Sequence, residues 1–284
     1  MRGQKIGFHE FIPPYLDPTT TGSKILQGVN YASAGGGILN ASGAIYGARL
    51  NMDDQLGYFE KTRQEIISLL GEAAALDRLK KSLFTVTMGS NDFITYYLNP
   101  IVGDKNQSPE NFANLMISRF RIQLTRLYHL GARKIAVPNV GPIGCVPNEI
   151  DLNPSAGDNC VAFPNQAAQE FNVRLRSLIP ELNRSLKGAM FVHADVYTVF
   201  LNIIINYQSY GFETRNSACC SLAGTHGGLI PCNPTSKVCP DRSKYVFWDP
   251  FHPTDATNII ITNSLLDGGT SIIFPMNIRQ LVSS

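Results

Sequence analysis

The pattern of apolar and polar residues along the chain changes repeatedly between two periods. Short runs rich in apolar and β-branched residues predict buried strands at 28–32, 83–88, 134–138 and 190–194. Longer stretches with apolar residues three and four positions apart predict helices at about 52–81, 109–130, 163–186, 198–207 and 254–266. Strands that alternate with helices indicate an α/β fold with a parallel sheet, helices on both faces and right-handed crossovers.

Polar or glycine-rich turns follow two of the predicted strands. The strand at 83–88 ends in Gly89 and leads into Asn91, which we expect at the carboxyl edge of the sheet, where open α/β folds build their sites. The strand at 28–32 leads into glycines 35–37, and a bare backbone N–H in such a turn can approach a substrate oxygen. The structural alternatives are an asparagine that caps its turn and a loop that needs only positive φ angles.

A carboxylate and an imidazole lie three residues apart near the C-terminus, in the segment Trp248-Asp249-Pro250-Phe251-His252-Pro253-Thr254. The prolines bias Asp249 and His252 toward extended backbone, and Thr254 is placed to cap the next helix. An aspartate oxygen can accept the Nδ1 hydrogen of the histidine, which leaves Nε2 free to deprotonate a hydroxyl. A solvated surface pair is the structural alternative.

Together these segments resemble the plant-type GDSL (SGNH) esterase/lipase family. The likeness runs from the first residues to the end of the chain and includes 12–16, 28–39, 89–92, 131–134, 140–147, Cys219-Cys220 and the D-x-x-H block. The resemblance implies a single domain over residues 1–284 with a three-layer α/β/α, flavodoxin-like fold. It also implies that His252 is the general base, Asp249 its orienting carboxylate, Asn91 the side-chain oxyanion donor and Gly35, rather than Gly36, the backbone donor.

One family feature is absent from the sequence. The Gly-Asp-Ser tripeptide that carries the family's nucleophile does not occur, and no G-x-S-x-G segment replaces it. We therefore expect an N-terminally incomplete chain that lacks the nucleophile, the first strand and the signal peptide of the family. The strands at 28–32 and 83–88 should then face each other across a gap or pair directly. Ser33 and Ser90 are alternative nucleophiles, although both are explained as polar turn residues.

Two functional hypotheses follow from the resemblance. In the first, the protein is a serine esterase or lipase that hydrolyses acyl lipids or acylated small molecules, acts as a monomer and needs neither a cofactor nor a metal. In the second, the chain is catalytically silent, as a truncated isoform or a remnant that binds esters or lipids. An incomplete gene model would also explain the absent tripeptide.

Composition narrows the class of partner. With 284 residues, 44% hydrophobic and 16% charged, the chain is long and apolar enough for a substantial core. A net charge of +2 supports no nucleic-acid partner. The longest apolar stretches, such as 199–205, are too short to span a bilayer, so we do not expect an integral membrane protein.

The cysteines indicate an oxidising compartment for the family parent. Six cysteines, four of them crowded into 219–239, favour disulfides, although the sequence leaves the pairing open. A structural zinc site that uses these thiolates with His226 is the alternative. Sequons at Asn40, Asn106 and Asn183 support secretion, with Asn106 the weakest because Pro109 follows its Ser108.

Overall fold

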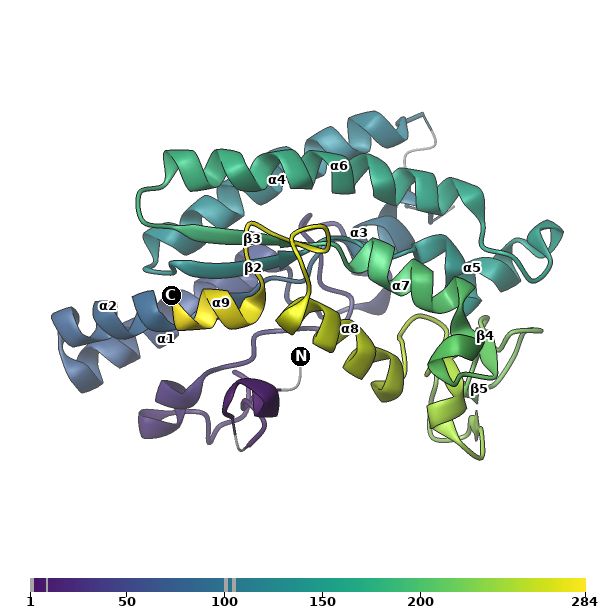
Figure 1. Ribbon diagram of the computed structural model, residues 1–284, viewed down its shortest axis with the longest axis horizontal. Helices are drawn as coiled ribbons and strands as arrows, with labels where there is room; N and C mark the ends of the chain where they lie inside the picture. Colours follow the sequence, from purple (N-terminus) through teal and green to yellow (C-terminus); the bar gives the residue numbers. More distant parts are fainter. Residues whose placement is uncertain (1–2, 9, 100–101, 104–105) are drawn as a thin grey trace.

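A four-stranded sheet forms the centre of the computed structural model, which describes residues 3–8, 10–99, 102–103 and 106–284 (Figure 1). The strand order is β1–β2–β3–β8. β1 (Leu83–Thr85), β2 (Lys134–Pro138) and β3 (Met190–Ala194) run parallel, and β8 (Ile273–Phe274) pairs antiparallel with β3. This mostly parallel sheet with helical connections confirms the predicted α/β class, whereas β8 was not predicted.

Helices cover both faces of the sheet, so the molecule has three layers (Figure 1). α4 (Pro109–His129) and α6 (Ala162–Ser185) pack side by side over one face. α8 (Asp255–Asp267) and α9 (Ile278–Ser283) lie over the other face, next to α7 (Val196–Ile205). These helices confirm four predicted ones to within a few residues, and α9 is an addition.

Side chains from successive strand residues enter two different cores. Ile135 and Phe191 belong to the cluster beneath α4 and α6, while Ala136 and Val192 belong to the cluster beneath α7, α8 and α9. This alternation follows from the two-residue period of a strand. Because helices cover both faces, all five residues of β2 are buried, which explains the continuous apolar run that predicted this strand.

The long helix predicted at 52–81 is two helices. α1 (Met52–Leu70) ends at Gly71, and α2 (Glu72–Lys81) begins directly after it. Gly71 has φ 78° and ψ 157°, a conformation that favours glycine and that no α-helix contains. The apolar period continues across Gly71, so the pattern alone did not show the break.

The prediction of a strand at 28–32 is wrong. In this segment Asn30 forms a single bridge with Pro14, through the bonds Tyr15 N–H to Asn30 O (2.8 Å) and Asn30 N–H to Pro13 O (2.9 Å). Its backbone is not paired with β1, so β1 forms the edge of the sheet within the described residues. A strand needs a neighbour for its N–H and C=O groups, and this segment finds that neighbour in 13–15. The two segments are therefore not paired directly.

Two small sheets and three disulfides shape the loops at the far end of the molecule. β4 (Thr214–Ala218) pairs with β7 (Tyr245–Phe247), and β5 (Cys220–Ser221) pairs with β6 (Lys237–Val238). The disulfides are Cys145–Cys160, Cys219–Cys239 and Cys220–Cys232. They confirm the expectation of disulfides and overturn the zinc alternative, because every cysteine sulfur is already bonded to another. Of the helices in the described ranges, none combines the length and apolarity that a membrane crossing requires.

Candidate active site

The turn that carries Asp249 and His252 is closed by main-chain hydrogen bonds between β7 and α8. Phe247 and Pro253 form a bridge, and the Trp248 N–H donates to the His252 carbonyl (2.8 Å). Thr254 then caps α8 by accepting from the Thr257 N–H (3.2 Å), as its position in the sequence predicted. The residues between strand and helix are therefore held in one defined loop.

Within this turn Asp249 orients the imidazole of His252. The Asp249 Oδ2 lies 2.8 Å from His252 Nδ1, and Oδ1 accepts the backbone N–H groups of Phe251 (2.8 Å) and His252 (2.7 Å). The Asp249 side chain is 16% exposed and the His252 side chain is 73% exposed. The carboxylate is thus fixed inside the turn, while the far edge of the imidazole, with Nε2, faces outward.

Both pKa values move in the direction that suits an oriented base. Burial alone would raise the pKa of Asp249, but hydrogen bonds from His252 and Phe251 outweigh it and hold the pKa below its ordinary value. The hydrogen bond with Asp249 raises the pKa of His252, and partial burial opposes this shift. At low pH the pair is an ionised carboxylate beside an imidazolium, and His252 becomes a base once it loses its Nε2 proton.

Asn91 lies at the carboxyl edge of the sheet, where the sequence placed it. It is the middle residue of the short helix α3 (Ser90–Asp92), which follows Gly89 at φ 125°. A Cβ on Gly89 would lie 2.7 Å from Val140, so only glycine allows the backbone to turn this close to the segment after β2. The Asn91 Nδ2 donates one hydrogen to the Gly36 carbonyl (2.9 Å), which leaves its second hydrogen for another acceptor.

The glycine-rich loop is tightly packed around its main chain. A Cβ on Gly36 would lie 2.4 Å from the Leu50 carbonyl oxygen, so a side chain there is excluded. The Gly36 N–H donates to the Ser33 carbonyl (3.1 Å). The Gly35 N–H, by contrast, has no acceptor within hydrogen-bond reach among the residues that the structure describes. Gly35 therefore offers a free backbone donor and Gly36 does not.

Asp92 fixes this loop, and sequence reasoning assigned it no role. Its side chain is fully buried, and it accepts hydrogen bonds from the N–H groups of Ile38 (2.9 Å) and Leu39 (2.8 Å) and from the Ser42 hydroxyl (2.7 Å). Burial raises the pKa of Asp92 to about 6, against the hydrogen bonds that lower it. Neighbouring residues Asn91 and Asp92 thus hold the same loop, one through a carbonyl and the other through amides.

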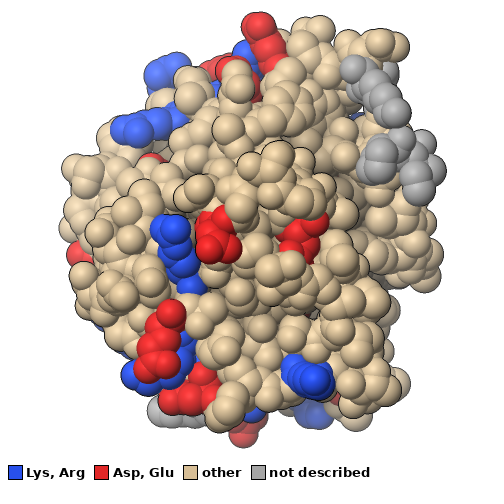
Figure 2. Space-filling view, turned by 90° about the vertical axis from the view of Figure 1, so that its right-hand side faces the viewer, with Lys and Arg blue, Asp and Glu red and all other residues tan. Residues whose placement is uncertain are grey.

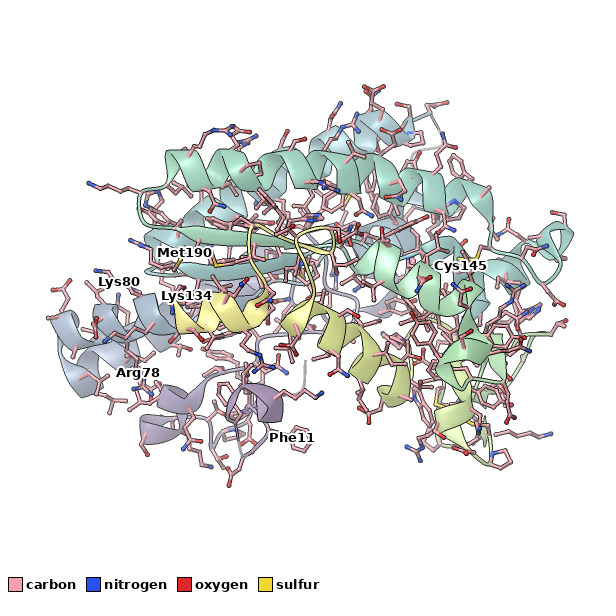
Figure 3. The ribbon with its side chains drawn as sticks, in the orientation of Figure 1. Phe11, Arg78, Lys80, Lys134, Cys145 and Met190 are labelled. Atoms are coloured by element: carbon pink, nitrogen blue, oxygen red, sulfur yellow. A yellow bond between two sulfur atoms is a disulfide. The ribbon has the colours of Figure 1, made fainter. Side chains whose placement is uncertain are left out.

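The two halves of the candidate site rest against one segment, the chain that follows β2. Gly89 abuts Val140, and the Pro250 carbonyl accepts from the N–H of Asn148 (3.0 Å) at the start of α5 (Pro147–Leu152). In Figure 3, Lys134 and Met190 mark the first residues of β2 and β3 at the left, and Cys145 lies at the right, beyond the strand ends. Both halves are therefore at the carboxyl end of the sheet.

The two alternative serines, Ser33 and Ser90, lie in different local surroundings. The Ser33 Oγ accepts from the Leu50 N–H (3.0 Å) and donates to the Ala34 carbonyl (3.4 Å), while Ser90 is the first residue of α3. Neither shares a hydrogen bond with His252 in the described part of the chain. Ser33 therefore has hydrogen-bond partners inside its own loop, whereas Ser90 is exposed at the start of α3.

A cavity of about 210 Å³ lies elsewhere, beneath the Cys145–Cys160 disulfide. Its wall includes Ile150, Leu201, Ile204 and Arg215 and none of the four candidate site residues. We therefore assign the site from the hydrogen-bonded side chains and not from this cavity.

Comparison with known proteins identifies the class. Over residues 3–265 the sequence matches the family described as GDSL-like Lipase/Acylhydrolase. The chain belongs to this family, as its motifs predicted, and the role of the family is the hydrolysis of carboxylic esters.

Among its relatives is the Arabidopsis thaliana protein GDSL esterase/lipase At4g16230, which is 56% identical over 99% of this chain and 77% of that protein. Two further Arabidopsis thaliana proteins, GDSL esterase/lipase At2g23540 and GDSL esterase/lipase At3g50400, are each 47% identical over 98% of this chain. The matches cover 73% and 76% of those proteins.

Proposed function

We propose that this chain provides the base and the oxyanion donors of a serine-type carboxylic ester hydrolase. His252 is the general base, Asp249 orients it, and Asn91 and Gly35 stabilise the oxyanion. The observation that carries the proposal is the imidazole of His252, whose Nδ1 is held by the largely buried Asp249 carboxylate, 16% exposed, while its Nε2 edge faces solvent. Family membership supplies the reaction class.

The proposed chemistry follows the logic of a catalytic triad. His252 Nε2 removes the proton of a serine hydroxyl as the serine oxygen attacks the ester carbonyl carbon. Negative charge then develops on the carbonyl oxygen, where the Gly35 N–H and the second Nδ2 hydrogen of Asn91 can donate. The imidazolium returns the proton to the departing alcohol. Water, deprotonated by the same Nε2, then attacks the acyl carbon, and the imidazolium returns the proton to the serine oxygen as the acyl–serine bond breaks and the acid leaves.

The surroundings of Gly35 favour an uncharged, apolar substrate. A Cβ on Gly35 would lie 3.3 Å from the ring of Tyr46, so this ring sits directly on the candidate oxyanion loop. Tyr46 and its neighbour Ile45 are 53% and 47% exposed. Figure 2 views the molecule from the carboxyl end of the sheet, and charged side chains of both signs are scattered over a mostly uncharged surface. We propose acyl esters, lipid or small-molecule, whose apolar part packs on Tyr46.

The proposed reaction requires a serine nucleophile. These 284 residues contain no Gly-Asp-Ser tripeptide, and we propose that the attacking serine belongs to such a segment of the complete protein. A second candidate function for the 284 residues alone is that they bind esters or lipids without catalysis. It is supported by the Ser33 hydroxyl, which is hydrogen-bonded inside its own loop, and by the lack of a hydrogen bond between His252 and either serine among the described residues. The disulfides support secretion of the complete protein.

Hydrolysis of p-nitrophenyl butyrate tests both possibilities. The 284-residue chain should hydrolyse this ester no faster than its own His252→Ala variant. The same chain, extended at its N-terminus by a segment that carries a Gly-Asp-Ser tripeptide, should be active. In that extended protein His252→Ala should lower kcat by about 10⁴- to 10⁶-fold, since base and nucleophile act as a unit.

The matched control is His226→Gln in the extended protein, which should keep most of the activity. Activity of the 284-residue chain that depends on His252 would place the nucleophile inside it. A folded extended protein that hydrolyses no ester, or that stays active without His252, would contradict the assignment of the base.

A further inference from the structure

The chain contains three sequons for N-linked glycosylation, at Asn40, Asn106 and Asn183. They differ in whether the folded protein leaves room for a glycan. Attachment replaces one hydrogen on the asparagine Nδ2 with a bulky, hydrophilic oligosaccharide. It occurs on the nascent chain, so the folded state decides which glycans are compatible with the native fold. An accepting asparagine must therefore direct its amide into solvent in the folded protein.

Asn183 does not meet this requirement, because its side-chain amide is hydrogen-bonded to the main chain of a strand. It lies on α6, and its Nδ2 donates to the Phe191 carbonyl (2.8 Å) while its Oδ1 accepts the Phe191 N–H (2.7 Å). Phe191 lies in β3 opposite Ile135 of β2, and β8 reaches only His193 and Ala194 on the other side. The Asn183 amide therefore takes the place of a neighbouring strand for Phe191, whose side chain is fully buried.

A glycan on Asn183 would separate α6 from β3. The Nδ2 atom faces a main-chain carbonyl inside the protein, so an attached sugar would displace that strand or leave its N–H and C=O without partners. Molecules modified there would not reach the native fold. Asn183 is thus a structural residue in spite of its sequon.

Asn40 meets the requirement. It is exposed, in a turn, and its main-chain carbonyl accepts from Arg49 Nη2 (2.6 Å) and Asn51 Nδ2 (3.1 Å). Its side-chain amide has no hydrogen-bond partner within the part of the chain that the structure describes. The turn is also fixed, because Leu39 and Ser42 on either side of it both donate to Asp92. A free amide therefore projects from an anchored turn.

Asn106 differs from Asn40 in its local sequence. Its Ser108 is followed by Pro109, which fixes the φ angle at the start of α4 and removes a backbone N–H. This restriction is already present in the nascent chain, before any fold forms. It disfavours the adaptable backbone that a modifying enzyme needs around the sequon.

We propose that Asn40 carries an N-linked glycan and that Asn183 does not. The Asn40 Nδ2 loses a proton and bonds to the anomeric carbon of an oligosaccharide, whose bond to a lipid-linked pyrophosphate breaks. The pyrophosphate-bearing lipid leaves with the electron pair. The glycan stands at the edge of the loop that contains Gly35 and Gly36, and so at the rim of the proposed oxyanion site rather than over α4 and α6.

The test is site occupancy in secreted protein. The chain is expressed behind a cleavable leader in a eukaryotic host, and the folded, disulfide-bonded fraction is treated with peptide N-glycosidase in heavy-oxygen water. Mass spectrometry should find the heavy-oxygen label on residue 40 and none on residue 183. On gels, Asn40→Gln should remove the shift that the glycosidase causes in the parent protein. The matched variants Asn106→Gln and Asn183→Gln should leave that shift unchanged.

A folded protein without sugar on Asn40, or with sugar on Asn183, would overturn the proposal. Translation in the presence of microsomes tests the glycosylation of Asn40 even if the protein is poorly secreted. Glycosylated chains stay in the microsomal lumen, where they can be recovered. A glycan shift should appear there and should shrink by one glycan in Asn40→Gln. An identical shift in the parent chain and in Asn40→Gln would also contradict the assignment.

Discussion

Two histidine–aspartate pairs in this molecule have the same shortest nitrogen–oxygen distance, but only one of the two histidines keeps a nitrogen free to act as a base. His252 Nδ1 lies 2.8 Å from Asp249, and His226 Nδ1 lies 2.8 Å from Asp151. The second nitrogen of His226 also faces a carboxylate, that of Asp158 at 2.9 Å. The His226 side chain is 10% exposed. The His252 side chain is 73% exposed. A base therefore requires more than a carboxylate partner, because one imidazole nitrogen must also stay free.

The His226 pair acts as a structural clamp. Asp151 on α5 accepts the N–H groups of His226 (3.0 Å) and Gly228 (2.7 Å) in addition to the imidazole. Asn148, one turn earlier on α5, donates to the carbonyls of Gly228 and Pro250. The clamp thus helps to fix the segment on which the Asp249 turn rests, without itself offering a proton acceptor.

After removal of His252 itself, the largest effect should come from Asp249→Asn in the extended, active protein. An asparagine can donate to Nδ1 and stabilise the wrong tautomer, so kcat should fall by about 10⁴-fold while the fold is kept. Steady-state hydrolysis of p-nitrophenyl butyrate measures the change. The matching variant at the other pair, Asp151→Asn, should change kcat far less. Equal losses in both variants would remove the distinction between base and clamp.

Asn91→Ala should have the next largest effect. Loss of one oxyanion donor should lower kcat by about 10²- to 10³-fold with a smaller change in KM, because the hydrogen bond strengthens on the oxyanion. Activity and thermal melting are measured together. If the variant melts earlier but its folded fraction keeps normal kcat, Asn91 only holds the Gly36 carbonyl and is not an oxyanion donor.

Loss of the clamp should lower the free energy of unfolding rather than kcat. Asp151→Ala leaves His226 and two backbone N–H groups without their buried acceptor, and the free energy of unfolding should fall by about 3 kcal/mol. Asp158→Ala is the control, because the Asp158 side chain is 79% exposed and its removal should cost much less. Urea titration compares the two variants, and equal losses would contradict the clamp.

The stability that the clamp contributes should decrease as pH rises. Burial would lower the pKa of His226, but the hydrogen bonds with Asp158 and Asp151 outweigh it and raise the pKa. A raised folded-state pKa gives stability that is complete below the ordinary histidine value of about 6.5 and is lost as pH rises through the folded value. The difference in unfolding free energy between wild type and His226→Gln should therefore shrink as pH rises above the ordinary histidine pKa of about 6.5. A difference that grows over this range would contradict the ion pairs.

The sequence predicted best what depends on neighbours along the chain. Asp249 and His252 are three residues apart with prolines beside them, so their contact follows from local geometry. Four of the five predicted helices, at 109–130, 163–186, 198–207 and 254–266, were also found to within a few residues. The break at Gly71 was missed, because an apolar pattern gives no sign of one residue with a positive φ.

The sequence predicted least what depends on distant partners. The segment 28–32 has the composition of a strand but is not in the sheet, since a strand is defined by a neighbour that composition does not reveal. Asp92 was missed for the same reason, because its hydrogen-bond donors Ile38 and Leu39 lie 54 and 53 residues away in the chain. The choice of Gly35 as oxyanion donor rested on resemblance, and it gains support from the free N–H that folding leaves there.

Nitrogen-15 NMR of the histidine side chains during a pH titration of the 284-residue chain tests the central claim most directly. Neutral His252 should carry its hydrogen on Nδ1 with a bare Nε2, and its pKa should lie above the ordinary value and fall in Asp249→Asn. His226 should keep hydrogens on both nitrogens above the ordinary histidine pKa. A neutral His252 with its hydrogen on Nε2, or a pKa that Asp249→Asn leaves unchanged, would contradict the assignment of His252 as an oriented base.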